Sequence, residues 1–178
     1  YEALIACDQL IIRAKNQKEM LEGICRHMVQ LGAMEAAWIG MRVAAEPRLL
    51  VQARHCSSRD CPDFLNTVWP LDMSHNADPV GLAMHTSQPV WLQNLDKEPA
   101  FQTFCAQASL QGWRSAAVLA LACNDMPVGV LVVYASAAHV FDAGAQRLLT
   151  QLASNISQAL DNFQQNAHRQ LAQVHLTE

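Results

Sequence analysis

The stretch WRSAAVLALACNDMPVGVLVVYA, residues 113–135, decides the fold of this chain. It contains two apolar runs, 114–123 and 126–135, on either side of Asn124 and Asp125. Because Asn and Asp tolerate the positive φ angles of a two-residue hairpin turn, the stretch predicts two long antiparallel strands. Both strands are apolar on both faces, whereas an antiparallel strand with one face in water would alternate. We therefore expect a sheet that is covered on both sides.

Helical patterns at the two ends of the chain can cover one face of this sheet. Apolar residues recur with helical spacing in residues 2–14, and Asn16 is a good N-cap for a second helix that ends at Gly32. Asp142 is expected to cap a closing helix that runs to at least Asn166.

The middle of the chain supplies shorter elements. Residues 36–43 and 49–55 predict a hairpin, and residues 56–78 form a polar insert with a short helix expected over 63–68. A helix over 79–86, a strand over 89–92 and a helix over 99–111 follow. This order predicts an α+β fold with a central antiparallel sheet. The N- and C-terminal helices lie on one face, and the short helices and loops lie over a cavity on the other.

The composition fits one globular domain of 178 residues. Apolar residues make up 51% and charged residues only 16%, which excludes a disordered segment. The net charge is −4 and no stretch is strongly basic, so we expect no nucleic-acid partner. The longest apolar runs fall far short of the roughly 18 residues that cross a bilayer, and we expect no membrane contact within this segment. Because the chain opens at Tyr1 without a signal peptide, we expect a piece of a longer protein.

Six cysteines are scattered through the sequence: Cys7, Cys25, Cys56, Cys61, Cys105 and Cys123. A domain of this size does not need disulfides, so the sequence favours reduced cysteines and a cytoplasmic location. The metal-capable side chains that cluster in the sequence are His55, Cys56, Cys61 and His75. Because Cys56 and Cys61 lack the Cys-x2-Cys spacing of a structural zinc site, we interpret these side chains as surface loop residues and expect no metal.

With this order of elements the chain resembles a GAF domain, the PAS-like small-ligand sensory module of bacterial signalling proteins. The residues that carry the resemblance are GLAMHTSQPVWLQNL (81–95), Phe101 after Glu98 and Pro99, Gly129-Val130-Leu131, and FDAGAQRLLTQLASNISQAL (141–160). Ser87 stands where the family has a turn glycine, and Asn124 and Asp125 replace the usual Asp-Gly hairpin. The family has no universal ligand, so the resemblance names no ligand and no cofactor.

The resemblance implies a sensory or regulatory domain of a multidomain cytoplasmic signalling protein. Residues 1–166 would form the domain and bind an unidentified small molecule. Residues 167–178 would continue the C-terminal helix toward an output domain, either a cyclic-dinucleotide enzyme or a histidine kinase. Two alternatives stay open. One is a ligand-free structural dimerisation module, and the other is a redox enzyme that reduces free methionine sulfoxide with Cys56, Cys61 or Cys105. Because phosphate-loop and hydrolase motifs are missing from the sequence, we expect no enzyme and assign no catalytic residues.

Tryptophans mark the expected ligand site. Trp69, Trp91 and Trp113 belong to the elements that would cover the cavity side, and each offers a flat surface with one N–H donor. His85 lies just before the turn into the short strand and could face the same cavity. We therefore expect these four side chains to line a ligand cavity between the sheet and the insert of residues 56–112.

An apolar series along the closing helix predicts dimerisation. Its members are spaced three or four residues apart, close to a heptad seam: Leu149, Leu152, Ile156, Ala159, Phe163, Ala167, Leu171 and Val174. Leu148 and Leu160 are left to pack on the domain's own sheet. We therefore expect a homodimer through the terminal helices, in which a signal shifts or rotates the paired helices.

Overall fold

The computed structural model describes residues 2–43, 48–58, 61–65, 69–70 and 78–177. The predicted central hairpin is confirmed. Its strands are β5 (Ser115–Cys123) and β6 (Met126–Ala135), which pair antiparallel. Asn124 and Asp125 join them with φ angles of 52° and 64°, the left-handed conformation that a tight hairpin turn requires.

The strands of the described residues form one antiparallel six-stranded sheet in the order β3-β2-β1-β6-β5-β4. The remaining strands are β1 (Ala36–Arg42), β2 (Arg48–Cys56), β3 (Trp69–Pro70) and β4 (Val90–Leu92). β1 and β2 form the expected hairpin, and β1 pairs with β6 so that Trp38 lies opposite Val132. The central hairpin therefore has β1 on one side and β4 on the other.

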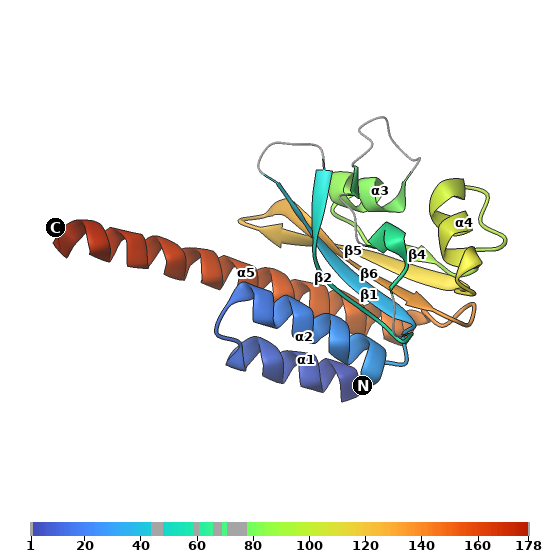
Figure 1. Ribbon diagram of the computed structural model, residues 1–178, viewed down its shortest axis with the longest axis horizontal. Coiled ribbons are helices and arrows are strands. Elements are labelled where there is room, and N and C mark those ends of the chain that lie inside the picture. The colour runs from blue at the N-terminus through green and yellow to red at the C-terminus, as the bar shows by residue number, and fades with distance from the viewer. Residues whose placement is uncertain (1, 44–47, 59–60, 66–68, 71–77, 178) are drawn as a thin grey trace.

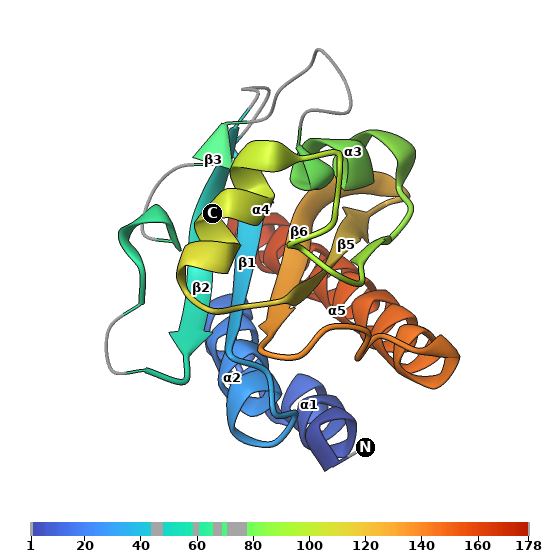
Figure 2. The same cartoon turned by 90° about the vertical axis from the view of Figure 1, so that its right-hand side faces the viewer.

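Helices cover both faces of this sheet (Figure 1 and Figure 2), as the sequence predicts for an α+β fold. One face carries α1 (Glu2–Arg13), α2 (Gln17–Gln30) and α5 (Ala143–Thr177). The other face carries the 3-10 helix η1 (Asp63–Leu65), α3 (Pro79–Thr86) and α4 (Gln102–Leu110). None of the helices in the described part of the chain is long and apolar enough to span a bilayer.

Local capping explains where several helices begin. The Asn16 side chain accepts a hydrogen bond from the Glu19 amide at 2.8 Å, and the Asp142 side chain accepts one from the Ala145 amide at 2.8 Å. Phe101 has a left-handed backbone with a φ of 59°, so α4 begins after it rather than at residue 99. The helix expected over 63–68 is a single turn at η1, and residues 66–68 lie outside the described residues.

Alternation along the strands divides the apolar residues into two cores. Ile39, Leu131 and Val133 pack against the terminal helices. Trp38, Val132 and Tyr134 pack against the short helices on the other face. Both cores are built from fully buried strand residues, because successive side chains of a strand point to opposite faces.

The predicted dimer seam along α5 is wrong for its first four members. Leu149, Leu152, Ile156 and Ala159 are 0 to 6% exposed and belong to the core beneath the sheet, together with Leu160. Apolar residues spaced three and four apart are equally typical of a helix lying on a sheet. Here α5 packs on the sheet through these residues. The helix itself continues beyond Asn166 as expected, and residues 164–173 are exposed.

Replacing Gly129 tests the close approach of β1 and β6. A Cβ atom there would overlap the Gly40 carbonyl oxygen and lie 2.7 Å from the Met41 sulfur. We expect Gly129→Ala to lower the free energy of unfolding by about 2–3 kcal/mol. The added methyl group would collide with the Gly40 backbone, which cannot move aside as a flexible side chain can. Gly144→Ala is the control, since its Cβ would meet nothing closer than the Asp142 carboxylate at 3.5 Å. Urea unfolding measures both, and equal effects would contradict this packing.

Candidate functional site

The sheet face opposite the terminal helices carries a group of stacked rings, which we call the aromatic cluster: Trp38, Phe64, Phe104, Trp113 and Tyr134. The Trp113 and Tyr134 rings are stacked with centroids 4.5 Å apart, and Phe104 stacks on Tyr134 at 5.7 Å. Phe64 meets Trp113 edge to face at 6.2 Å. These are favourable aromatic geometries, so the cluster is an ordered set of contacts around Tyr134.

Tyr134 occupies the centre of the cluster because its neighbours in the sheet are small. Ala36 of β1 and Ala116 of β5 lie opposite Tyr134 on its two sides. Their methyl groups fill little of the space above the sheet. The larger rings of Trp113 and Phe104 can therefore stack on Tyr134.

A buried hydrogen bond fixes the two rings that come from strands. The Trp38 indole Nε1 donates to the Tyr134 hydroxyl at 3.2 Å, and both side chains are at most 1% exposed. Burial raises the pKa of Tyr134, and the negative charge of Asp78 adds to this shift, while the hydrogen bond from Trp38 opposes it. Tyr134 therefore stays a neutral phenol at physiological pH.

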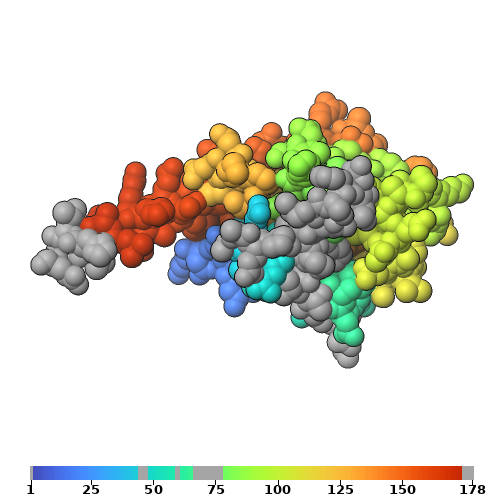
Figure 3. Space-filling view, turned by 90° about the horizontal axis from the view of Figure 1, so that it is seen from above, coloured from blue at the N-terminus to red at the C-terminus, as the bar shows by residue number. Residues whose placement is uncertain are grey.

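Asp78 places a carboxylate at the N-terminus of α3, close to this phenol. Its side chain accepts a hydrogen bond from the Val80 amide at 3.0 Å, with Pro79 in the first turn as the sequence predicts. Val80, Ala83 and Met84 then pack into the same core as the rings. Seen from the side of α3 and α4, these two helices lie at the outer surface over this face (Figure 3).

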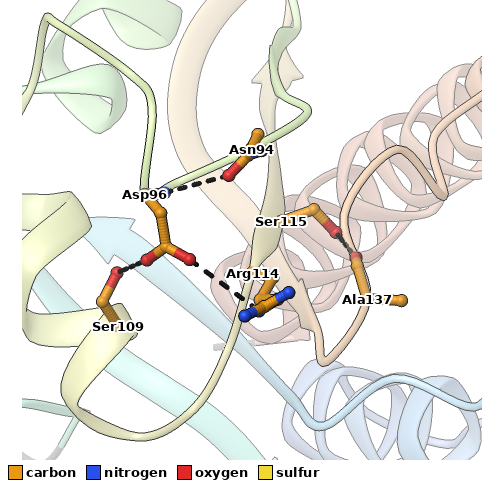
Figure 4. Close-up of polar contacts among 6 residues, drawn as sticks. All are labelled: Asn94, Asp96, Ser109, Arg114, Ser115 and Ala137. Carbon is orange, nitrogen blue, oxygen red and sulfur yellow. Dashed lines mark hydrogen bonds and ion pairs between the residues drawn. The ribbon is translucent and has the colours of Figure 1, made fainter.

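Polar contacts position the loop from which Trp113 projects (Figure 4). Asp96 accepts a hydrogen bond from the Ser109 hydroxyl at 3.0 Å and lies 3.8 Å from the Arg114 guanidinium. The fully buried Ser115 hydroxyl donates to the Ala137 carbonyl at 2.7 Å. The Trp113 amide donates to the Ala108 carbonyl at 3.2 Å. These contacts hold Trp113 between the end of α4 and the start of β5.

Of the four residues predicted to line the site, the described side chains place Trp113 in the cluster. The predicted position of Trp91 is wrong, because this side chain packs on the opposite face of the sheet, with its ring centroid 6.0 Å from that of Phe141. Its neighbours Val90 and Leu92 face the cluster instead, as strand alternation requires. His85 is exposed on α3. Trp69 pairs with Leu49 through β3, but its side chain lies outside the described residues.

The other four rings of the cluster were not predicted from the sequence. Trp38 and Tyr134 lie in the predicted strands, where alternation alone places Tyr134 on the same face as Val130 and Val132. The register between strands, which brings Trp38 within hydrogen-bond reach of Tyr134, could not be obtained from either strand by itself. The predicted cavity would also involve residues 66–68 and 71–77, which lie outside the described residues.

The cysteines differ from the expectation of six reduced thiols. Cys56 and Cys61 form a disulfide, and both pack against the core that contains the aromatic cluster. Their five-residue separation, which was too long for a zinc pair, allows the loop after β2 to close on itself. Cys105 is a buried side chain in the same core, and burial raises the pKa of its thiol to about 11, with the Glu98 charge adding to the shift.

No group of three metal-capable side chains lies together among the described residues. His75, which the sequence places near Cys61, lies outside them.

Comparisons with known proteins agree with this architecture. The family model of the GAF domain matches residues 14–161. The chain is similar to the free methionine-R-sulfoxide reductase of Neisseria meningitidis in complex with its substrate, with 16% identity, a TM-score of 0.75, and coverage of 93% of this chain and 90% of that one. No curated protein sequence matches significantly.

Two further solved structures are GAF domains. The domain from the Acinetobacter phosphoenolpyruvate-protein phosphotransferase has 16% identity, a TM-score of 0.71, and coverage of 94% of this chain and 96% of that one. The phycoerythrobilin-bound domain of a cyanobacterial phytochrome has 13% identity, a TM-score of 0.75, and coverage of 94% and 97%. At such identities these likenesses concern the fold alone.

The buried phenol predicts a specific dependence of stability on pH. The pKa of Tyr134 is raised in the folded state, so its stabilising effect is complete below the unfolded pKa of about 10 and is lost as pH rises above it. Tyr134→Phe cannot ionise. We expect the wild type to lose stability relative to this variant above about pH 10, by up to about 1.4 kcal/mol per pH unit.

Urea unfolding at a series of pH values measures the difference between the two proteins. Thiols with raised pKa values contribute equally to both and cancel. Near pH 7 the variant should be about 1 kcal/mol less stable, because it lacks the hydrogen bond from Trp38. Parallel stability curves above pH 10 would show that the phenol is not buried as described.

Proposed function

Because the chain belongs to the GAF domain family, we propose that it is a sensory or regulatory module that binds a small molecule over the aromatic cluster and signals through α5. The observation that carries this proposal is the position of β5. Ala116 and Val118 of this strand lie in the core of the aromatic cluster, while the C-terminal end of the strand contacts α5. One strand therefore touches both the candidate site and the helix that leaves the domain.

The cluster favours a ligand with a flat, largely apolar surface. Trp38 and Tyr134 are held by strands and by their mutual hydrogen bond, whereas Trp113 comes from the loop between α4 and β5. Trp113, like Phe64 of η1 and Phe104 of α4, is supplied by the elements that cover the sheet, so it can move without breaking the sheet. We propose that a flat molecule stacks in contact with Trp113 and finds polar partners in the Trp113 indole N–H group and the Asp78 carboxylate.

Signal transfer would use a set of hydrogen bonds between the β5–β6 hairpin and α5, which we call the hairpin contact. Ser157 Oγ accepts from the Ala122 amide at 3.0 Å, and Asp161 Oδ1 accepts from the Asn124 amide at 2.9 Å. The Cys123 thiol, which has one proton to donate, lies within hydrogen-bond distance of Gln164 Oε1 and of the Asp161 carboxylate. Ser157, Asp161 and Gln164 follow one another at helical spacing, so they form one stripe of α5 facing the hairpin.

The hairpin contact ends where α5 leaves the body of the domain. Hydrogen bonds from the Cys123 thiol and the Asn124 amide lower the pKa of Asp161, which keeps this carboxylate ionised and a strong acceptor. A displacement of β5 caused by ligand would change these contacts first. We propose that the exposed part of α5 transmits this change to an output domain such as a cyclic-dinucleotide enzyme or a histidine kinase.

We propose a cytoplasmic location and no enzymatic activity. The four free cysteines agree with a reducing compartment, whereas the Cys56–Cys61 disulfide is the observation that speaks against it. That disulfide also favours the second candidate, a reductase of free methionine sulfoxide. The raised pKa of Cys105 argues against it, because the thiolate is the nucleophile in such chemistry and is scarce at neutral pH. We therefore expect purified protein to show no turnover of methionine sulfoxide.

The binding proposal is tested with two tryptophan variants on opposite faces of the sheet. Native mass spectrometry of freshly purified wild type should show a bound small molecule. Trp113→Ala should reduce the bound fraction by about tenfold, because it removes a stacking surface. Trp91→Ala, which removes the same ring from the other core, should leave binding unchanged. A wild type that carries no bound small molecule, or an equal loss of binding in both variants, would contradict the proposed ligand site.

The hairpin contact is tested at Asp161. Asp161→Ala should increase hydrogen exchange of the Asn124 amide and of α5 beyond Gln164, because the hairpin no longer holds the helix. Asp161→Asn keeps an oxygen acceptor and should retain most of the protection. His168→Ala is the control, since this exposed residue lies beyond the contact. Hydrogen–deuterium exchange measures all three, and an unchanged Asn124 amide in Asp161→Ala would exclude this role.

A further inference from the structure

The outer edge of β2, at the margin of the sheet, is only partly paired (Figure 2). β3 pairs with Arg48 and Leu49, the first two of the nine residues of β2, and no other described strand lies on that side. We call the remaining stretch, residues 50–56, the open edge. Backbone N–H and C=O groups along such an edge can pair with a strand from another chain.

A hydrogen bond at the end of β2 indicates which backbone groups face outward. The Ser57 amide donates to the Glu35 carbonyl at 2.8 Å, on the side of β1. Residues of an antiparallel pair alternate between those that exchange such bonds and those that do not. Ala53 and His55 therefore direct their backbone groups at β1, whereas Arg54 between them directs its N–H and C=O outward. Arg54 thus offers one donor and one acceptor to an added strand.

A groove of about 440 Å³ follows the open edge between α2 and β2, and it is lined by Glu22 and Arg26 of α2 and by residues 51–55 of β2. Arg54 lies opposite Trp38 in the strand register, so its side chain is on the sheet face of the aromatic cluster. Arg26 belongs to α2, which covers the other face. Both arginines are exposed, and neither has an ion-pair partner among the described residues.

The charge of the open edge is opposite in sign to that of the whole chain. The chain contains 16 acidic and 12 basic residues and has a net charge of −4. The strand β2, RLLVQARHC, contains two arginines and a histidine but no acidic residue. Glu22 is the acidic residue that lines the groove. Because the cations of this edge attract acidic segments and repel basic ones, the edge selects its partner by charge.

We propose that the open edge of β2 binds an extended acidic segment of a partner protein, which adds to the sheet as a further strand. Backbone hydrogen bonds to Arg54 hold the segment, and its acidic side chains, which point alternately to the two faces, meet Arg26 on one face and Arg54 on the other. Gln52 is an extra residue of β2 at a β-bulge, which interrupts the edge and restricts pairing to a short segment. This docking does not depend on a ligand at the aromatic cluster.

The test measures fluorescence anisotropy of a labelled short peptide of alternating glutamate and valine, titrated with the full chain. The wild type should bind this peptide and should not bind the same peptide with lysine in place of glutamate. Arg54→Glu should raise the dissociation constant at least about tenfold, because attraction becomes repulsion. Arg147→Glu is the matched control, since Arg147 is an exposed arginine of α5 outside the groove, and it should bind nearly as the wild type does. Glu22→Gln should tighten binding by about threefold, because it removes the acidic side chain from the groove.

Strand addition is separated from simple charge attraction by the peptide backbone. The acidic peptide with N-methyl groups at alternate residues keeps its charges but cannot donate the backbone hydrogen bonds, so it should bind at least about tenfold more weakly. Hydrogen–deuterium exchange should show protection of the Arg54 amide when the unmodified peptide binds. A wild type that does not bind the acidic peptide, or that binds the N-methylated form equally well, would overturn the proposal. Equal losses in Arg54→Glu and Arg147→Glu would overturn it as well, because they would show non-specific attraction.

Discussion

The whole molecule depends on a central hairpin whose two strands cannot face water on either side. Leu131 and Val133 of β6 are fully buried against the terminal helices, and Val132 and Tyr134, which alternate with them, are buried on the other face. Apolar burial contributes roughly 25 cal/mol per Å², so neither cover can be removed without a large loss of stability. This requirement explains the two helical layers and the separation of the interior into two cores that meet only at the sheet.

The two cores differ in the kinds of side chain that they contain. The core beneath α5 consists mainly of aliphatic side chains, which interlock and give a firm base. The other core contains rings stacked on Tyr134, supported by Ala36 and Ala116 in the neighbouring strands. One of the stacked rings, Trp113, is supplied by a loop. The candidate site thus arises where small residues in the sheet coincide with large residues in the covering elements.

Local patterns in the sequence were enough for the fold but not for the site. Asn124 and Asp125 specify a tight turn by their own conformational preferences, and Asp78 with Pro79 specifies the start of α3 in the same way. Trp91 was misplaced because the facing of a three-residue strand depends on its register with β5, which no local pattern encodes. The stripe from Leu149 to Ala159 was misassigned because one spacing serves both a helix pair and a helix on a sheet. The Cys56–Cys61 bridge depends on a loop path that propensities do not describe.

Beyond Gln164 the last helix has no further hairpin to hold it, yet it continues as a single element to Thr177. An uninterrupted helix turns by about 100° and rises about 1.5 Å with each residue. The number of residues after the hairpin contact therefore sets the angular phase of anything joined to this helix. Inserting one residue there would rotate that attachment by more than a quarter turn, whereas inserting seven would nearly restore its orientation while moving it about 10 Å outward. Fusions and length variants of this helix should thus show a periodic response, with a period set by the α-helix.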